Sequence, residues 1–337
     1  MLREALRRLG RRALGRVEHQ PPPEGPADHF SSAPPRPIVP GEALTVVSWN
    51  LQFAAGTRHH FFYDGGQAVF VPPDEVRAVL QAQGEALRVM APDLALLQEV
   101  DRGADRTGRL DQLPPLAKAM GATGTASAVI HRALYVPTPS HRPMGRVELH
   151  QATCSTRGLT RAGRTALPLM REARWRQVFN LKRAVLWAEL PVEGHKHPLW
   201  VGNVHLSAFS RGDGTLQAQV QRLCEQLQTF PPEQPWILAG DFNLLPLGDD
   251  PARLGKDAAE YTDDPNPLAA LTKLAQEAFA APLAAEARTY IPHGGAADRK
   301  IDHVFTGGPV EVLSAEVETR YDALSDHRPL VVRVRIF

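Results

Sequence analysis

Short runs of apolar residues mark a series of expected strands from residue 41 onward. The run at 236–239 is bounded by Pro235 and Gly240 and is too short for a helix, which is typical of a buried strand. The expected strands cover 44–49, 94–98, 184–190, 199–204 and 236–239, and 301–305, 310–313 and 330–336 close the chain. The turn at 193–196 should pair the strand before it with the strand after it.

In some of the intervals between these runs, apolar residues recur at the spacing of a helix. After Pro73, apolar residues keep helical spacing as far as Pro92, so a helix is expected there. A second amphipathic helix precedes the strand at 236–239, and a further helix is expected over 267–279. The apolar residues of the helix after Pro73 are Val76, Val79, Leu80, Leu87 and Met90. Those of the helix before the strand at 236–239 are Leu216, Val220, Leu223 and Leu227.

Two stretches have no clear period. Residues 53–71 contain the aromatic run Phe61-Phe62-Tyr63, and a long loop or hairpin is expected there. Residues 101–177 are rich in Gly, Pro and Arg. We expect them to form short strands and loops around a cleft.

The first forty residues differ from the rest of the chain. In the segment 1–20, leucines at helical spacing alternate with arginines as far as Val17, which predicts a basic amphipathic helix. Such a helix can lie on an anionic membrane surface or dock on a partner, although a solvated helix against its own domain is a simpler explanation. Residues 21–40 are proline-rich and polar and are expected to be an extended linker. The folded domain should span 41–337.

Composition and charge are those of a globular protein. The 337 residues suffice for one large domain or two ordinary ones, and a hydrophobic content of 43% can supply a packed core. The formal net charge of +1 argues against nucleic-acid binding through overall charge but allows a local basic patch. Cys154 and Cys224 make no disulfide framework and match no zinc spacing. Because no run could span a membrane and no secretory signal is evident, a cytoplasmic location is expected.

Polar residues gather at the ends of the expected strands. Asn50, Glu99, His205, Asp241 and Asn243 end or directly follow a strand, whereas Asp302, Asp326 and His327 precede or begin one. If the closing strands run antiparallel to the others, all of these side chains meet at one edge. Each residue alone has an ordinary explanation as a turn, a cap or a structural residue. Packing alone does not explain why so many polar residues of these types occur together at strand ends.

The stretch 240–243 illustrates this arrangement at one strand end. Gly240 permits a sharp turn of the backbone. Because side chains alternate along an extended chain, Asp241 and Asn243 should share one side, with Phe242 on the other side in packing. An acid and an amide are therefore expected to project together.

Six short motifs, in this order, resemble those of the endonuclease/exonuclease/phosphatase superfamily, which has the deoxyribonuclease I-like fold. They are Ser48-Trp49-Asn50, Leu97-Gln98-Glu99, Asn203-Val204-His205-Leu206, Gly240-Asp241-Phe242-Asn243, Lys300-Ile301-Asp302-His303 and Leu324-Ser325-Asp326-His327-Arg328-Pro329. The resemblance covers roughly 44–337. It implies an α/β (α+β) four-layered sandwich, with two mixed β-sheets packed face to face and helices on the outside, and a metal-dependent phosphoesterase activity.

By this resemblance, Glu99 would bind Mg²⁺ or Mn²⁺, with Asn50 nearby and Asp326 beside the metal. The chemistry agrees, because a phosphodiester is anionic and its hydrolysis needs positive charge on the non-bridging oxygens. Hard cations of this kind prefer oxygen ligands. Cysteine is absent near the motifs and no His-x₃-His pair occurs in the sequence, which argues against a zinc site.

The resemblance also implies the catalytic roles. His327, oriented by Asp302, would be the general base or would polarise the phosphate. Asp241 would position or deprotonate the attacking water. Asn243 would hold a phosphate oxygen, and His205 would stabilise the pentacovalent transition state. A histidine near its neutral pKa and fixed by a carboxylate suits such proton transfer.

One stretch departs from the family pattern. Many members carry a Gly-Asn or Gly-Val pair before a strand of the form Ala-x-x-Ser-Arg, whereas the corresponding residues 145–156 here include Arg146 and His150. His150 either reaches the phosphate or is a structural histidine. Arg146, His150 and Arg183 are the expected substrate-binding residues.

The residues between His131 and Arg183 are strongly basic within a nearly neutral chain. Arginine forks suit phosphates, and Tyr135 and Trp175 can stack on bases, so DNA or RNA is the first expected substrate. Alternatively, these cations are solvated or paired with acids elsewhere. They are Arg132, Arg142, Arg146, Arg157, Arg161, Arg164, Arg171, Arg174, Arg176, Lys182 and Arg183, against Glu148 and Glu172.

A different hypothesis is a membrane-surface enzyme that acts on a phospholipid headgroup, as sphingomyelinase-like and inositol-phosphatase-like relatives do. The basic N-terminal segment and the run Phe61-Phe62-Tyr63, as insertion residues, motivate this hypothesis. A third hypothesis is a non-catalytic phosphate-binding module, which is disfavoured because no motif position is lost. Endo or exo cleavage, the number of metals and the oligomeric state stay open.

Overall fold

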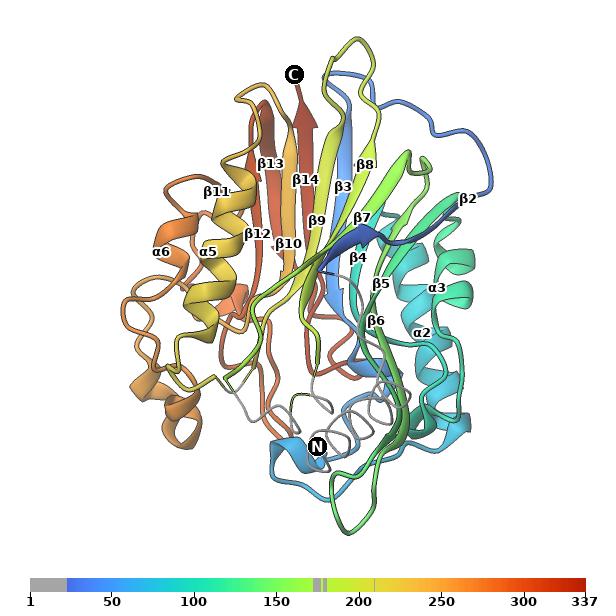
Figure 1. The fold of residues 1–337 in the computed structure, drawn as a ribbon, viewed down its shortest axis with the longest axis vertical. Helices are drawn as coiled ribbons and strands as arrows, with labels where there is room; N and C mark the ends of the chain where they lie inside the picture. The colour runs from blue at the N-terminus through green and yellow to red at the C-terminus, as the bar shows by residue number, and fades with distance from the viewer. Residues whose placement is uncertain (1–22, 172–176, 178–180, 209) are drawn as a thin grey trace, which may run out of the picture.

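Two mixed β-sheets of seven strands each form the centre of the molecule (Figure 1). The structure is a computed structural model that describes residues 23–171, 177, 181–208 and 210–337. The expected basic helix in the segment 1–20 lies outside the described residues.

The first sheet has the strand order β1-β7-β8-β9-β10-β12-β11, and the second has the order β13-β14-β3-β4-β6-β5-β2. The strands of the first sheet are β1 (Glu24–Pro26), β7 (Arg161–Ala166), β8 (Ala184–Leu190), β9 (Leu199–His205), β10 (Trp236–Asp241), β12 (Asp302–Gly307) and β11 (Gln276–Glu277). Those of the second are β13 (Val310–Val317), β14 (Leu330–Ile336), β3 (Ala43–Asn50), β4 (Leu94–Asp101), β6 (Gly145–Ser155), β5 (Gly124–Val136) and β2 (Asp28–Ser31).

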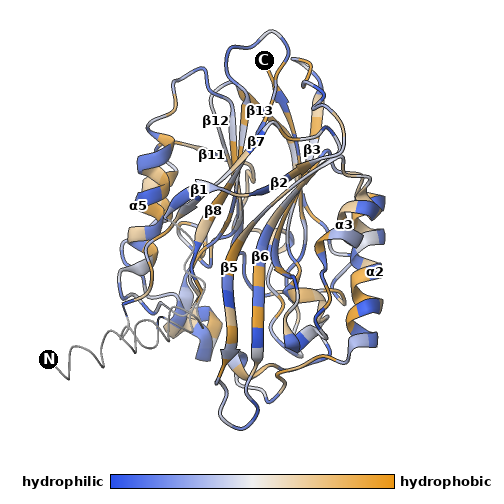
Figure 2. Ribbon diagram, turned by 45° about the vertical axis from the view of Figure 1, so that its right-hand side comes forward, coloured by the Kyte–Doolittle hydropathy of each residue, from blue (hydrophilic) through white to orange (hydrophobic). Residues whose placement is uncertain are grey.

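Helices cover the outer face of each sheet (Figure 1). α2 (Pro73–Met90) and α3 (Leu113–Met120) pack on the second sheet, while α5 (Thr215–Leu227) and α6 (Leu268–Leu271) pack on the first. Short 3₁₀ helices lie in the connections: η1 (Gln52–Ala54), η2 (Phe62–Asp64), η3 (Asp105–Thr107), η4 (Pro251–Glu260) and η5 (Ala285–Ala287). Figure 2 shows hydrophilic and hydrophobic stretches alternating along α2 and α5, as expected for helices with one buried face.

Apolar side chains fill the space between the two sheets, among them the fully buried Leu96 and Ile237. Burying one such aliphatic side chain stabilises the fold by about 1.5–3 kcal/mol. The expected sandwich of two mixed sheets with helices outside is therefore confirmed.

The helix expected after Pro73 is present with the predicted bounds. Pro73 occupies the first turn, where its missing N–H costs nothing, and Asp74 and Glu75 in that turn complement the helix dipole. The helix ends at Met90 and is capped by Ala91, which has a φ of 47° and directly precedes Pro92. Local signals thus suffice to define this element.

Strand direction brings the ends of both sheets together. β3 runs parallel to β4, and β9 runs parallel to β10. β12 is antiparallel to β10, and β14 is antiparallel to β3, which meets the condition under which the polar strand ends share one edge. The carboxyl ends of the first four strands therefore lie at the same edge as the amino ends of the last two.

Amide side chains tie the two sheets to each other close to this edge. The Gln98 side chain donates to Asn203 Oδ1 at 2.8 Å, which links β4 to β9. Asn203 Nδ2 in turn donates to the carbonyl oxygens of Leu97 and Ala152, at 3.1 and 2.9 Å. These buried bonds restrict sliding of one sheet over the other.

Two expected elements differ in the structure. Residues 101–177, expected to be irregular, contain α3 and the long hairpin of β5 and β6. These strands are rich in Ala, Ser and Thr, so hydrophobic alternation in them is weak. The helix expected over 267–279 is limited to α6, because Glu277 joins the edge strand β11 and pairs with Lys300 at 2.7 Å.

The expected linker is structured where it is described. Residues of β1 pair with β7, and residues of β2 pair with β5, so the segment adds an edge strand to each sheet. Ile38 is fully buried between the sheets. Proline is tolerated there because edge strands leave some N–H groups unpaired.

Among the described residues, none of the helices combines the length and the apolar character needed to cross a bilayer. The cytoplasmic location stays a prediction.

Candidate active site

The loop that contains Asp326 and His327 is fixed to the end of β3. The indole Nε1 of Trp49 donates to the carbonyl oxygen of His327 at 2.8 Å, and the hydroxyl of Ser325 donates to the carbonyl oxygen of Asn50 at 2.7 Å. These bonds hold a loop distant in sequence against the strand end.

Asp241 is the centre of a buried polar cluster at the shared edge. Its Oδ2 accepts a hydrogen bond from Asn50 Nδ2 at 3.1 Å and lies 3.2 Å from His205 Nε2. Its Oδ1 accepts from the backbone N–H of Asn243 at 3.0 Å. His327 Nε2 lies 3.7 Å from the same Oδ2. Burial raises the pKa of Asp241 well above its ordinary value, so this carboxylate is poised to take up a proton.

His327 and Asp302 form a dyad beside this cluster. Nδ1 of His327 lies 2.8 Å from Asp302 Oδ2. Burial opposes protonation of His327, but Asp302 and Asp241 outweigh burial and raise the pKa of the imidazole well above its usual range. For His205, in contrast, burial and the nearby Arg183 lower the pKa well below that range. The site therefore holds one charged and one neutral histidine.

The backbone at three site positions adopts a left-handed conformation. Gly240 has a φ of 150°, and a Cβ there would lie 1.9 Å from the carbonyl oxygen of Val204. Only glycine fits this close approach. Asn243 and Glu99 have φ angles of 51° and 55°, which are rare for residues with a side chain. Such backbone strain is concentrated at functional sites.

A β-bulge places Glu99. β4 pairs with β6 through Leu97 and Ala152, and pairing resumes with Val100 and His150. One strand therefore has an extra residue at this point, and a bulge of this kind re-aims a side chain. The carboxylate of Glu99 makes no hydrogen bond or ion pair with another described residue.

The donors around Glu99 fit a hard divalent cation. Asp326 lies on the same cavity wall as Glu99, and burial, reinforced by Glu99 and Asp241 and opposed by His327, raises its pKa to about 7. Two neighbouring carboxylates and the amide of Asn50 offer oxygen donors, which suit Mg²⁺ or Mn²⁺. Glu99, Asp326 and Asn50 are thus the residues that would hold the ion.

A second set of donors lies close by. One atom each of Asp241, Asp302 and His327 falls within 4.8 Å of the others. The imidazole Nδ1 already bonds to Asp302, so this set is better suited to proton transfer than to metal binding.

The predicted residues, except Asp302, Arg146 and His150, line one cavity of about 380 Å³. Arg183 lies in its wall and is buried. Its Nη1 has no hydrogen-bond partner among the described residues, and burial lowers the pKa of its guanidinium to about 10. A buried cation with an unused donor favours an anion in the cavity.

Arg146 and His150 lie elsewhere. Arg146 pairs with Glu148 at 2.7 Å, and its side chain is half exposed. His150 is buried in the sheet, with its Nε2 3.6 Å from Glu148 Oε1. Neither residue lines the cavity, so their expected contact with substrate finds no support in the structure. The alternation of side chains along a strand does not show on which face of the sheet Arg146 and His150 lie.

Many cations of the basic segment are paired. Arg132 shares Glu148 with Arg146, and Arg157 contacts Glu42 and Asp93. Arg161 lies 3.7 Å from Glu189, and the guanidinium of Arg142 lies over the ring of Phe70 at 4.6 Å. Arg174, Arg176 and Trp175 lie outside the described residues. The described part of the segment therefore offers less free positive charge than its composition suggests.

No role is predicted from the sequence for Tyr290, Tyr261 or Arg106 at the site, and Tyr63 is expected there only as a membrane-insertion residue. The ring of Tyr290 meets the ring of His327 edge to face, with centroids 5.2 Å apart. Tyr63, Tyr261 and Arg106 also line the cavity. They come from irregular connections, where hydrophobic periodicity carries no signal.

A buried charge network supports Asp302 from behind. Lys300 Nζ lies 2.7 Å from Glu277 Oε1 and donates to the carbonyl oxygen of Asp302 at 2.7 Å. His303 contacts the same Glu277 oxygen at 2.9 Å, and its Nε2 lies 2.9 Å from the carbonyl oxygen of Leu244. The network therefore joins the start of β12 to the turn after Asn243.

Glu277→Gln should lower the free energy of unfolding by about 3 kcal/mol at pH 7, because it leaves the buried Lys300 without its counter-charge. Burial opposes ionisation of Glu277, but His303 and Lys300 outweigh burial and lower its pKa from 4.5 to about 2. A lowered pKa stabilises the fold above the unfolded-state pKa, and this stabilisation is lost as the pH falls from 4.5 to about 2. Urea titrations at several pH values test both statements. Equal pH dependence of the wild type and the variant would contradict them.

Comparison with known proteins agrees with this geometry. The model of the Endonuclease/Exonuclease/phosphatase family matches residues 47–327. The fold is that of hydrolytic phosphoesterases, and the chain belongs to the endonuclease/exonuclease/phosphatase family. No curated protein matches the chain.

Solved structures share the fold at low sequence identity. An endonuclease/exonuclease/phosphatase from Beutenbergia cavernae DSM 12333 is 20% identical, with 87% of this chain and 72% of that chain covered and a TM-score of 0.56. One from Bacteroides vulgatus is 15% identical, with 88% and 100% covered and a TM-score of 0.55. The human Nocturnin catalytic domain, with a bound sulfate anion, is 18% identical, with 92% and 98% covered and a TM-score of 0.52.

Proposed function

We propose that this chain is a divalent-metal-dependent phosphodiesterase. The observation that carries the proposal is the hydrogen-bonded cluster around Asp241, with His205 and the His327–Asp302 pair in contact with it or next to it. Glu99, whose side chain has no partner among the residues that the structure describes, lies on the wall of the same cavity. An acceptor for the proton of water and a cationic imidazole thus lie close to oxygen donors suited to Mg²⁺ or Mn²⁺.

In this proposal, Asp241 orients the attacking water and accepts its proton as the water oxygen bonds to phosphorus. His327, held charged by Asp302, donates to a phosphate oxygen. The neutral His205 and Asn243 contact the phosphoryl oxygens, and Arg183 offers its free donor to them. The ester P–O bond then breaks, and the departing alkoxide takes a proton from solvent to leave as an alcohol, while Asp241 returns to solvent the proton that it accepted. A divalent cation would offset the negative charge of the phosphoryl group.

Two substrate classes are supported to different degrees. The composition of the basic segment between His131 and Arg183 favours a nucleic-acid substrate. However, most of the described arginines in this segment are paired with acids or packed on an aromatic ring. A phosphodiester with an apolar group has support from the cavity, because the wall formed by β5, β6 and their flanks includes Val136, Val147 and Leu149. We therefore place a lipid-like phosphodiester ahead of DNA or RNA.

Hydrolysis of a substrate panel tests this order. We expect Mg²⁺-dependent release of phosphorylated product from vesicles or micelles of phospholipid, and less from plasmid DNA or RNA. Every activity should be lost in EDTA, because without the metal His327 and Arg183 compensate only part of the negative charge of the phosphoryl group. Cleavage of nucleic acid with none of phospholipid would reverse the order of substrates. Failure to hydrolyse any phosphoester with Mg²⁺ or Mn²⁺ would contradict the proposed function and leave a phosphate-binding module.

A further inference from the structure

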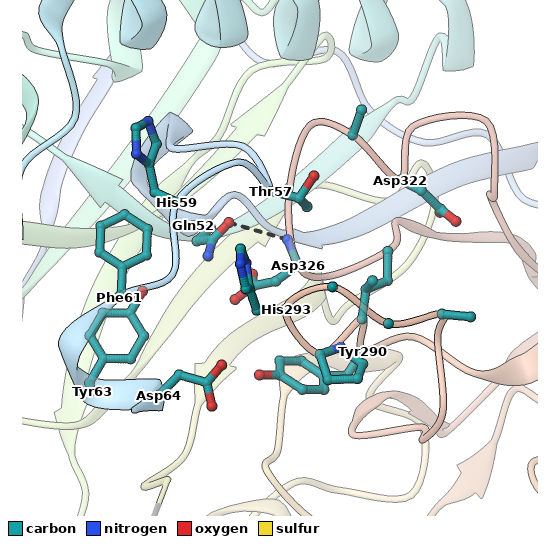
Figure 3. Close-up of a pocket in the computed structure, with 16 residues that line it drawn as sticks. Gln52, Thr57, His59, Phe61, Tyr63, Asp64, Tyr290, His293, Asp322 and Asp326 are labelled. Carbon is teal, nitrogen blue, oxygen red and sulfur yellow. Dashed lines mark hydrogen bonds between the residues drawn. The ribbon is translucent and has the colours of Figure 1, made fainter. Parts of the chain in front are cut away.

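Acidic side chains gather at two places near the catalytic cavity. One is the pocket in Figure 3, which includes Asp322 and Asp326. There Arg328 binds Asp322 through two contacts of 2.7 and 2.6 Å, and Asp326 belongs to the proposed metal site. The other place lies between the loop at 210–214 and the connection at 261–266, where the described residues supply no cation to pair with the acids.

These two segments pack closely against each other. Gly212 has a φ of 70°, and a Cβ at this residue would lie 3.0 Å from Thr262 Oγ1. Both segments also lie next to the catalytic cavity, since Ala208 and Tyr261 line it. The contact between the segments therefore joins two parts of the cavity wall.

Asp263 is a carboxylate without compensation at this contact. Both of its oxygens are buried, and neither has a hydrogen-bond partner among the described residues. Burial and the nearby Asp213 raise the pKa of Asp263, while Ser210 opposes them. No described Lys or Arg makes an ion pair with Asp263 or Asp213. A buried carboxylate beside a second carboxylate is unfavourable unless it binds a proton or a metal ion.

Two buried hydroxyl groups beside these acids also lack a partner. Ser210 is 4% exposed and Thr215 is 3% exposed, and their hydroxyl oxygens make no hydrogen bond with the described residues. The effect of Ser210 on the pKa of Asp263 places its hydroxyl next to that carboxylate. The backbone N–H of Thr215 donates to Asp213 Oδ1 at 2.8 Å. Because buried polar groups nearly always have a partner, these atoms point to a ligand between the two segments.

The donors at this contact are all oxygen atoms, which favours a hard cation. Asp263 and Asp213 supply two negative charges, and the hydroxyl of Ser210 supplies a neutral ligand. Asp213 is exposed, so water can complete the coordination. Ca²⁺ accepts such a mixture, because it takes about six to eight oxygen ligands in flexible geometry, whereas Mg²⁺ demands a near-ideal octahedron.

We propose that Asp213, Asp263 and Ser210 form a Ca²⁺ site that ties the loop after β9 to the connection before α6. The site is distinct from the catalytic centre, because none of these three residues lines the catalytic cavity. The ion offsets the charge of the two carboxylates and holds two parts of the cavity wall together. It takes no part in hydrolysis, so the site can be present whether or not the chain is a phosphodiesterase.

Calorimetric titration of Ca²⁺ into the full chain tests the site. Glu99→Gln serves as the parent variant, because this change weakens the proposed catalytic metal site. Ca²⁺ should still bind to it, with a Kd on the order of 0.1–1 mM. Adding Asp263→Asn should weaken binding about tenfold or more, and adding Ser210→Ala should weaken it by a smaller factor. Asp74→Asn is the matched control and should leave binding unchanged, because this acid lies on the exposed start of α2 and pairs with Arg77.

Thermal unfolding of the same variants gives a second readout. In EDTA at pH 7, adding Asp263→Asn should leave the unfolding temperature equal to that of the parent or higher, because it removes a carboxylate whose surroundings disfavour its charge. Excess Ca²⁺ should raise the unfolding temperature of the parent by about 4 °C. It should not raise that of the Asp263→Asn variant.

Two results would overturn the Ca²⁺ site. The first is Ca²⁺ binding that is absent from the Glu99→Gln parent or is unchanged by both Asp263→Asn and Ser210→Ala. The second is an Asp263→Asn variant that is unfolded by circular dichroism or less stable than its parent in EDTA, because the carboxylate would then be stabilised by partners within the protein.

Discussion

Asp302→Asn should lower kcat about 10³-fold with little change in fold. Asp302 Oδ2 lies 2.8 Å from His327 Nδ1, and its charge is the main influence that raises the pKa of this imidazole against the effect of burial. An amide of the same shape removes the charge and can present an N–H where the imidazole needs an acceptor. His327 would then be neutral in the variant, and the phosphoryl group would lose a charged donor.

The pH dependence of kcat distinguishes a loss of the His327 charge from a loss of structure in Asp302→Asn. Because Asp302 raises the pKa of His327, the wild type keeps protonated His327 to a higher pH than the variant does. The basic limb of kcat against pH should therefore move to lower pH in Asp302→Asn. Glu85→Gln on the exposed face of α2 is the control and should change neither kcat nor the profile. A variant with wild-type kcat and an unshifted basic limb would contradict the role given to the dyad.

Asp241→Ala is expected to have an effect at least as large, about 10³-fold or more in kcat. The carboxylate is buried and has Asn50, His205 and the backbone of Asn243 as partners, so its loss leaves no acceptor for the proton of water. Asp241→Asn keeps the shape of the side chain and should be equally inactive. Because Asp241 is buried, alanine at this position can destabilise the fold. The asparagine variant therefore distinguishes a loss of catalysis from a loss of folding.

The sequence predicted the part of the site that depends on strand ends. A buried strand such as β10 is recognisable from a short apolar run, and an antiparallel return places Asp302 directly opposite Asp241 in the register. The side-chain alternation that put Phe242 into packing is also observed, since this residue is fully buried. Local propensity and the two-residue period suffice for these positions.

Other features depend on tertiary contacts that leave no local pattern. The bulge that places Glu99 requires knowledge of the partner strand β6, and hydrophobic alternation in the long strands β5 and β6 is weak. Whether Arg146 is free to bind phosphate depends on Glu148 beside it in space. The ring of Tyr290 contacts that of His327 from an irregular loop. Glu277 pairs with Lys300 and lies in an edge strand, although a helix was expected over this part of the chain. Each case is one in which a long-range contact overrides local preference.

We propose that one metal-assisted centre, built where the ends of both sheets meet, hydrolyses phosphodiesters. The most direct measurement is the rate of hydrolysis of bis(4-nitrophenyl) phosphate by the wild type and by Asp241→Ala, each with Mg²⁺ or Mn²⁺, after EDTA, and after restoring the metal. We expect turnover by the wild type that EDTA abolishes and added metal restores, and none by the variant under any condition. Turnover that survives both EDTA and Asp241→Ala would place the chemistry elsewhere and contradict the account.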